Sequence, residues 1–191
     1  MIQFIGALIS GLNLGRIYAL IALGYTMVYG IAKMLNFAHG DIIMVGAYSV
    51  IVSAVTLKLP PIVAILIAVV VCAALGVTID FLAYRPLRQS PPLAVLITAI
   101  GVSYLLQNLA LLIFGPEQKS TPALFDLPSL TLGGVTVDGI TLLTLGVTAA
   151  IMVGLTLFIN LTRMGKAMRA VSEDRDAAEL MGISVNKTIT I

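Results

Sequence analysis

Long apolar windows separated by short polar stretches dominate this chain. Because a helix needs about 20 apolar residues to cross roughly 30 Å of hydrocarbon, each window without charged residues is a candidate membrane span. Three windows meet that length, residues 59–79, 89–116 and 139–162, and two shorter windows, 17–32 and 42–57, precede them. The pattern predicts five membrane-spanning helices and leaves the ends of the first two open.

Basic residues collect at the ends of these windows and predict which loops face the cytoplasm. Two arginines follow the window 59–79, and two arginines and a lysine follow the window 139–162. Cytoplasmic loops of membrane proteins carry an excess of Lys and Arg, so we expect both loops inside and the acidic loop 115–138 outside. Proline and glycine in this outer loop favour turns and a short hairpin through 130–137.

The N-terminal residues have two interpretations. Residues 1–9 could form an interfacial helix or part of another crossing. No basic residue precedes this apolar run, so we do not interpret it as a cleaved signal peptide. Alternation of the loops across the membrane then places the N-terminus outside and the polar residues 33–41 inside.

Composition supports a membrane bundle. The chain is 59% hydrophobic and 10% charged, with a mean hydropathy of +1.08, which is unlike a soluble domain. Small residues within the windows, such as Gly46 and Ala47, allow helices to approach closely in lipid, although chance enrichment is the alternative. We interpret Cys72, the one cysteine, as a small packing residue. The predicted fold class is all-α, a polytopic transmembrane helical bundle forming one domain over residues 1–191.

A polar segment, residues 33–41, interrupts the apolar pattern between the first two windows. It contains Asn36, His39, Gly40 and Asp41. Interruptions of this kind often build a path or a binding site from exposed backbone groups, so these four residues are candidates for a translocation path. The alternative is an ordinary cytoplasmic turn in which His39 and Asp41 cap the next helix.

Other polar side chains within the windows suggest further roles. Tyr25 and Tyr29 lie four apart on one helix face and are candidates to line the same path, with a packing stripe as the alternative. Asp80 is predicted to pair or snorkel near the inner interface. Gln107 and Asn108 are predicted to join helices rather than to bind substrate.

Nine of the 20 charged side chains lie in one segment, residues 163–187. Ser172 is predicted to cap a short helix with acids in its first turn, and Gly182 is predicted to end it. A helix of about nine residues is marginal alone in water, so we expect it to dock in a partner's groove. The alternative is a surface helix on lipid headgroups. The candidate docking residues are Ser172, Glu173, Asp174, Arg175, Asp176, Ala177, Ala178, Glu179, Leu180, Met181 and Gly182.

Several motifs resemble those of one family. Residues 18–24 (YALIALG), 36–41 (NFAHGD) and 46–48 (GAY) resemble the N-terminal signature of branched-chain amino-acid ABC transporter permeases of the LivH type. Residues 176–183 (DAAELMGI) resemble the cytoplasmic EAA loop of ABC permeases. The general motif often has Glu where this chain has Asp176.

The resemblance implies half of a translocation pathway in the cell inner membrane, importing branched-chain amino acids or related small amino acids, urea or amides. The implied partners are a second permease subunit, two ABC ATPase subunits and a periplasmic substrate-binding protein. Residues 163–187 would form the coupling loop, whose helix fits a cleft on the ATPase. The chain has no Gly-x-x-x-x-Gly-Lys-Ser/Thr loop, so we expect it to bind no cofactor and to leave ATP hydrolysis to its partners.

Two other function classes stay open. An autonomous channel or secondary carrier would need functional ionisable groups deep in the bilayer, and a membrane scaffold would bind partners without transporting. The net charge of +2 is too small to indicate nucleic acid, and the single histidine has no other metal ligands near it in the sequence. Residues 188–191 resemble the start of another apolar segment, so we expect a truncated chain and further spans in the complete protein.

Overall fold

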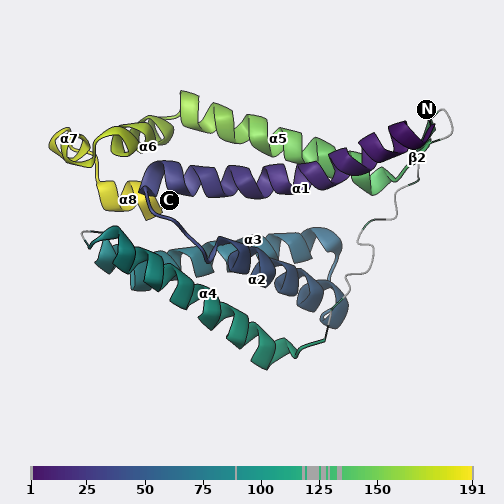
Figure 1. Cartoon of the computed structure of the whole chain (residues 1–191), viewed down its shortest axis with the longest axis horizontal. Helices are drawn as coiled ribbons and strands as arrows, with labels where there is room; N and C mark the ends of the chain where they lie inside the picture. Colours follow the sequence, from purple (N-terminus) through teal and green to yellow (C-terminus); the bar gives the residue numbers. More distant parts are fainter. Residues whose placement is uncertain are drawn as a thin grey trace. The chain divides into compact units, whose positions relative to one another are not determined.

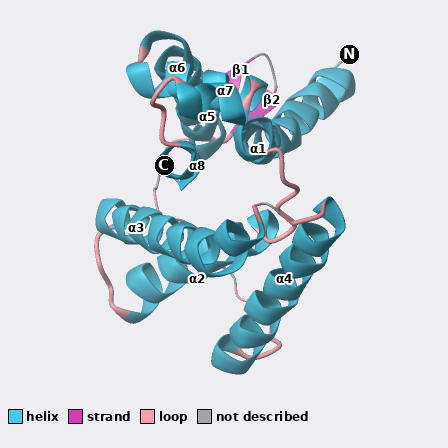
Figure 2. Cartoon of the chain, turned by 90° about the vertical axis from the view of Figure 1, so that its left-hand side faces the viewer, coloured by secondary structure: helices cyan, strands magenta, loops and turns pink. Residues whose placement is uncertain are grey.

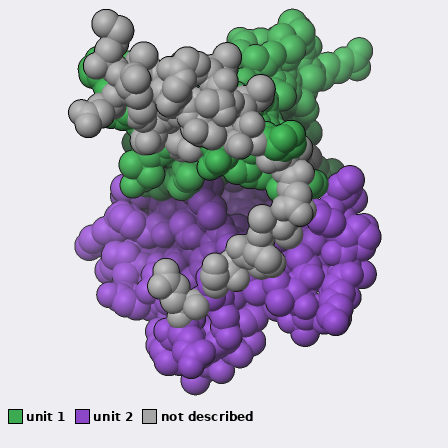
Figure 3. All heavy atoms as spheres, turned by 90° about the vertical axis from the view of Figure 1, so that its right-hand side faces the viewer, with its two compact units in different colours: residues 1–31, 125–188 green, residues 32–124, 189–191 purple. Residues whose placement is uncertain are grey.

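The chain divides into two compact units, which Figure 3 draws in different colours. Unit 1 comprises residues 1–31 and 125–188, and unit 2 comprises residues 32–124 and 189–191. The structure is a computed structural model. It describes residues 2–88, 90–117, 119, 125, 128, 130–132 and 135–190. Apart from one short hairpin, the regular elements in these residues are helices, which confirms the predicted all-α class.

Unit 1 contains a long N-terminal helix and the elements of the C-terminal part of the chain. The helix α1 runs without a break over Ile2–Ala32 (Figure 1). Residues 2–9 are therefore the first turns of α1 and are continuous with the first predicted window. The later elements are β1 (Leu130–Leu132), β2 (Val135–Val137), α5 (Gly139–Leu161), α6 (Arg163–Glu173), α7 (Arg175–Leu180) and α8 (Val185–Thr190), whose last residues belong to unit 2.

The hairpin lies just before α5. Its two strands, drawn in magenta in Figure 2, are antiparallel. Leu130 pairs with Val137, and Leu132 pairs with Val135. The short hairpin predicted for residues 130–137 is confirmed.

Unit 2 contains three long helices. They are α2 (His39–Ile51), continued by a π-helical turn (Val52–Thr56), α3 (Pro61–Ile79), continued by a second π-helical turn (Asp80–Tyr84) and a 3₁₀ turn (Arg85–Leu87), and α4 (Pro92–Phe114). Both α3 and α4 begin at the second residue of a Pro-Pro pair. Pro60 and Pro91 have ψ near 145°, because a residue that precedes proline is excluded from the helical region. The following proline has its φ already set for the first helical position.

Four helical stretches among the described residues are long and apolar enough to cross a membrane. They are His39–Thr56, Pro61–Leu87, Pro92–Phe114 and Gly139–Leu161. The first predicted window lies within α1, whose described residues include the shorter apolar stretch Ile17–Ile31. Large apolar side chains on these helices are exposed, for example Leu112 at 81%, as expected where lipid takes the place of water. The predicted transmembrane helical bundle is confirmed.

Small residues allow α2 and α3 to lie side by side in unit 2 (Figure 2). A Cβ added at Gly46 would lie 2.8 Å from the Cys72 sulfur. The Cys72 thiol in turn donates to the Ile42 carbonyl oxygen at 3.5 Å. The close approach predicted at Gly46 and the packing role predicted for Cys72 are both confirmed. The buried core of unit 2 consists of Ala38, Ile79, Tyr84, Val95, Ala99 and Leu106.

Candidate functional site

The polar segment between α1 and α2 folds as an ordered turn around Asn36. Lys33, which follows α1, has a φ of +52°, a left-handed conformation that takes the backbone out of a helix. The Asn36 side-chain oxygen accepts hydrogen bonds from the Ala38 backbone N–H at 3.0 Å and from the Tyr84 hydroxyl at 2.8 Å. The first bond is a local side-chain turn, and the second connects the segment to the π-helical turn after α3.

The prediction that His39 and Asp41 cap the helix after this segment is wrong. The helix α2 begins at His39, and its N-cap residue is Ala38, whose own side chain makes no capping hydrogen bond. The Asp41 carboxylate accepts hydrogen bonds from two residues of α4. The acid still lies in the first turn of α2, where the positive end of the helix dipole stabilises a negative charge.

Asp41 connects α2 to α4 through two polar side chains. Its carboxylate accepts hydrogen bonds from the Ser103 hydroxyl and from the Gln107 amide, the latter at 3.1 Å, and Asp41 itself is 7% exposed. The prediction that Gln107 joins helices is confirmed. The Asn108 amide instead donates to the Tyr104 carbonyl oxygen of its own helix at 2.7 Å.

The residues predicted to line a translocation path fall in both units. Residues 33–41 belong to unit 2, whereas Tyr25 and Tyr29 lie on the part of α1 that belongs to unit 1. Tyr29 is 47% exposed. The joint role of these side chains stays a prediction. Within the residues that the structure describes, no three His, Cys, Asp or Glu side chains are grouped so as to hold a metal ion.

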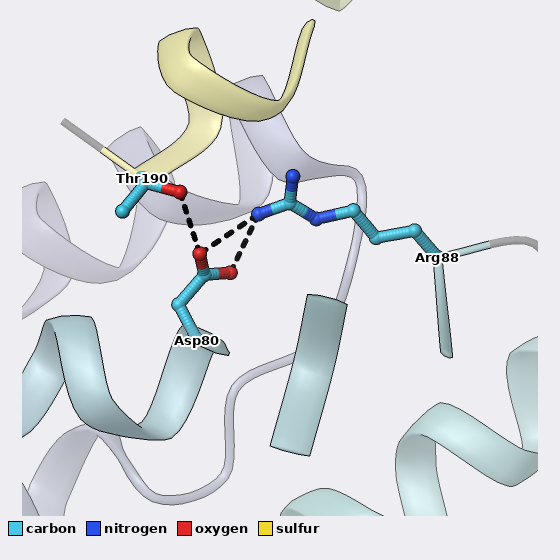
Figure 4. Close-up of polar contacts among 3 residues, drawn as sticks. All are labelled: Asp80, Arg88 and Thr190. Carbon is cyan, nitrogen blue, oxygen red and sulfur yellow. Dashed lines mark hydrogen bonds and ion pairs between the residues drawn. The ribbon is translucent and has the colours of Figure 1, made fainter. Parts of the chain in front are cut away.

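Asp80, at the first position of the second π-helical turn, is at the centre of a polar cluster (Figure 4). One guanidinium nitrogen of Arg88 donates to its two oxygens at 2.6 and 2.9 Å. The Thr190 hydroxyl donates to one of these oxygens at 2.6 Å. The Arg88 and Asp80 side chains are 8% and 16% exposed. The predicted pairing of Asp80 is confirmed, and the ion pair is largely buried.

A tight corner joins α5 to α6. The Thr162 hydroxyl oxygen, between the two helices, accepts from the Gly165 N–H at 3.0 Å and donates to the Phe158 carbonyl oxygen at 2.6 Å. A Cβ added at Gly165 would lie 2.2 Å from the Ile159 carbonyl oxygen and 2.4 Å from the Ile159 Cα. Only a residue without a side chain fits here.

The charged segment forms α6, α7 and the start of α8, where one short helix was predicted. Ser172 belongs to α6, and its hydroxyl donates to the Arg169 carbonyl oxygen at 2.7 Å. The prediction that Ser172 caps the docking helix is wrong, because Asp174 is the cap. One carboxylate oxygen of Asp174 accepts from the backbone N–H groups of Asp176 and Ala177, each at 3.0 Å. Asp is as strong an N-cap as Ser.

The C-terminal end of α7 is closed by Gly182, as predicted. Gly182 has a φ of +81°, which glycine adopts without steric cost. The Gly182 N–H donates to the Glu179 carbonyl oxygen at 2.9 Å, and the Ile183 N–H donates to the Ala178 carbonyl oxygen at 3.0 Å. This pair of bonds is a Schellman motif. The helix α7 therefore has a capped start at Asp174 and a defined end at Gly182.

The apolar residues at the C-terminal end of α7 and at its C-cap, Met181, differ in exposure. Ala178 is buried at 3% exposure, whereas Leu180 and Met181 are 89% and 83% exposed. Covering two neighbouring apolar side chains of that size with a second surface would be favourable. The end of α7 therefore offers two neighbouring apolar side chains on a fixed backbone.

Comparisons with known proteins agree with these features. Residues 7–191 match the sequence model of a family described as branched-chain amino acid transport system / permease component. The chain is 39% identical over 201 residues to the high-affinity branched-chain amino acid transport system permease protein BraD of Pseudomonas aeruginosa, in an alignment that covers 99% of this chain and 66% of BraD. No solved structure matches the chain.

Two further relatives are the high-affinity branched-chain amino acid transport system permease proteins LivH of Escherichia coli and of Salmonella typhimurium. Each is 37% identical to the chain, over 205 and 202 residues respectively, and each alignment covers 100% of this chain and 66% of the relative. The chain thus spans 66% of the length of these curated relatives. With a family match that extends over nearly all its residues, the chain belongs to the family of branched-chain amino acid transport system permease components.

Proposed function

We propose that this chain is a membrane-spanning permease subunit of an ABC importer. It moves branched-chain amino acids, or related small amino acids or amides, across the inner membrane. Its relatives are named as permease proteins of branched-chain amino acid transport, and four of its helices have the length and apolarity of membrane spans. Separate ATPase subunits bind and hydrolyse ATP, a periplasmic binding protein delivers the substrate, and a second permease subunit completes the path.

The observation that carries this proposal is the end of α7. The helix has only six residues, and a helix that short does not persist alone in water. Here Asp174 holds its start, Gly182 holds its end, and Leu180 and Met181 stay exposed. We assign this surface to a groove on the ATPase, since an apolar helix face in a groove is a recurring mode of protein recognition.

The connection between α7 and the membrane supports a coupling role. The helix α7 follows α6 directly, and α6 is locked to α5 at the corner formed by Thr162 and Gly165. A displacement of α7 by the ATPase would therefore be passed to a membrane-spanning helix. The alternating access of the path would follow from the tilt of that helix.

The path itself is assigned to the residues singled out in the sequence. They are Asn36, His39, Gly40, Asp41, Tyr25 and Tyr29. Asp41 is the strongest of these candidates, because it is a carboxylate within a candidate span, and ionisable groups in membrane helices commonly have functional roles.

The alternative function is an autonomous channel or secondary carrier for small polar solutes, although Asp41, the third residue of its candidate span, lies near the end of that span and not deep within it. Such a protein needs an ionisable group within the bilayer but no ATPase. Uptake of leucine into vesicles containing the permease without ATPase subunits or ATP would support this alternative. Uptake that depends on both would support the importer.

The docking surface is tested with Leu180→Glu combined with Met181→Glu in the transporter assembled with its ATPase subunits. Charges at an apolar contact should reduce ATPase co-purification about tenfold or more and abolish ATP-dependent uptake. The fold should not change, because both side chains are exposed. The matched control is Leu180→Met with Met181→Leu, which keeps both side chains apolar and should retain co-purification and uptake. Unchanged co-purification by the Glu variant would refute the docking role of α7.

A further inference from the structure

Three basic side chains form a row on the exposed side of α6. Arg163, Lys166 and Arg169 are spaced three residues apart, and all three are exposed. Residues at this spacing are neighbours on a helix surface, so the row is about 9 Å long. The opposite face carries the buried residues of α6, which are Gly165, Met168 and Val171.

The row lies next to the end of a membrane-spanning helix. The candidate span of α5 ends at Leu161, and Figure 1 shows α6 following this end directly. Gly165, in the first turn of α6, packs against the backbone of Ile159, in the last turn of α5. An Arg169 guanidinium nitrogen lies 3.5 Å from the Asn160 side-chain oxygen. These contacts fix α6 against the last turn of α5, so the basic row begins two residues after the candidate span ends at Leu161.

The positive charges of the row have no acidic partner among the residues that the structure describes. The ion pair among the described residues, between Asp80 and Arg88, lies in another part of the chain. The acids of the charged segment begin only at Glu173 and continue through α7. Basic residues therefore predominate along α6 up to Arg169, and acidic residues predominate from Glu173 through α7, where Arg175 is also present. An anionic surface would attract the first group and repel the acids of the second.

We propose that the Arg163–Lys166–Arg169 row binds the headgroups of anionic phospholipids. An anionic membrane surface strengthens the binding of each nearby Lys or Arg about fivefold, so three such residues contribute on the order of 100-fold. The row has the position, the exposure and the unpaired charge that this interaction needs. This function goes beyond transport and does not depend on the docking of an ATPase to α7.

The test uses the purified protein in a neutral detergent, titrated with phosphatidylglycerol and with phosphatidylcholine of the same acyl chains and followed by native mass spectrometry. The wild type should bind phosphatidylglycerol more tightly. The triple variant Arg163→Gln, Lys166→Gln, Arg169→Gln should lose most of this preference. Its affinity for phosphatidylglycerol should fall by at most about 100-fold, while its affinity for phosphatidylcholine stays the same. Added salt should weaken wild-type binding of phosphatidylglycerol as well.

Two variants serve as controls. Arg163→Lys with Arg169→Lys keeps the charges and should keep the preference. Lys119→Gln removes a positive charge from the segment after α4 and should change nothing. If the triple variant does not fold, as judged by helix content and thermal midpoint, Lys166→Gln alone should still lower the affinity about fivefold.

Two results would overturn the proposal. One is a wild type without preference for phosphatidylglycerol. The other is a triple variant that keeps the preference, and if this variant also loses ATPase co-purification, the row belongs to the ATPase interface. Failure of the Leu180 and Met181 test leaves these lipid measurements unaffected, so the two proposals fail separately.

Discussion

Two carboxylates lie in the apolar helices of unit 2, and their surroundings differ in kind. Asp80 accepts two hydrogen bonds from the Arg88 guanidinium and one from the Thr190 hydroxyl. Asp41 accepts from two neutral groups, the Ser103 hydroxyl and the Gln107 amide. No cation lies within ion-pair distance of Asp41 in the described part of the chain. An ion pair therefore stabilises the Asp80 carboxylate, whereas hydrogen bonds from uncharged donors stabilise the Asp41 carboxylate.

This difference teaches which groups each site needs. Breaking a buried ion pair leaves one charge without compensation and is strongly destabilising, whereas removing both partners together is often neutral. A carboxylate that bonds only to an amide and a hydroxyl can be replaced by an amide. The new amide, the neighbouring amide and the hydroxyl can each donate or accept a hydrogen bond, so the same pairs of groups can stay bonded. Asp80 should therefore respond to the loss of charge, and Asp41 should respond to the loss of hydrogen-bonding groups.

The largest effect is expected from Arg88→Ala. The substitution leaves the Asp80 carboxylate without its cation, and the free energy of unfolding should fall by about 3 kcal/mol, the low end for a buried pair because Asp80 is 16% exposed. Unfolding in mild detergent titrated with dodecyl sulfate measures this change. The double variant Asp80→Leu with Arg88→Leu should recover most of the loss.

The control for this substitution is Arg85→Ala. The Arg85 guanidinium lies 5.5 Å from the centre of the Phe81 ring, and Arg85 is exposed, so its loss should cost about 0.5–1 kcal/mol. Equal effects at the two arginines would show that the Asp80 pair is not the stabilising element.

A smaller effect is expected from Thr190→Val. This substitution keeps the shape of the side chain and removes the hydroxyl that donates to Asp80 at 2.6 Å. A hydrogen bond to a charged group contributes about 1.5 kcal/mol or more, so the free energy of unfolding should fall by about that amount. The same titration measures it, with Thr190→Ser as the variant that keeps the donor. A Val variant as stable as the wild type would mean that the bond contributes nothing.

The smallest effect is expected from Asp41→Asn. The new amide can bond to both Ser103 and Gln107, so the free energy of unfolding should change by less than about 1 kcal/mol. Asp80→Asn, the same chemical change at the other site, should cost about 3 kcal/mol because Arg88 loses its counter-charge. A larger loss at Asp41 than at Asp80, measured side by side, would reverse the contrast between the two sites.

The sequence was sufficient for the membrane spans but not for the partners of these carboxylates. Apolar windows predict helices because the bilayer sets their length, and α3, α4 and α5 lie within residues 59–79, 89–116 and 139–162. Thr190 is 110 residues from Asp80, and no local pattern relates positions so far apart. Arg88 is only eight residues away, but a π-helical turn and a 3₁₀ turn intervene, so regular helix periodicity does not predict the contact.

The cap of α7 was mispredicted for a different reason. Ser172 and Asp174 are equally suitable caps in isolation. The choice depends on where α6 ends, and α6 continues through Ser172 because Gly165, Met168 and Val171 bury its inner face. Tertiary packing of one helix thus decides the start of the next. The stop at Gly182 needed no such information, because only glycine adopts its positive φ easily.

The close contact at Gly165 has a mechanical consequence. With no spare volume between Gly165 and the Ile159 backbone, the joint between α5 and α6 cannot absorb motion by bending inward. A push of α6 toward α5 would therefore turn the two helices together; α6 is about 16 Å long and α5 is about 34 Å long. A rotation about the corner between α5 and α6 would move the far end of α5 about twice as far as the end of α6. A small displacement of α6 at one side of the membrane would then become a larger displacement of α5 at the other side.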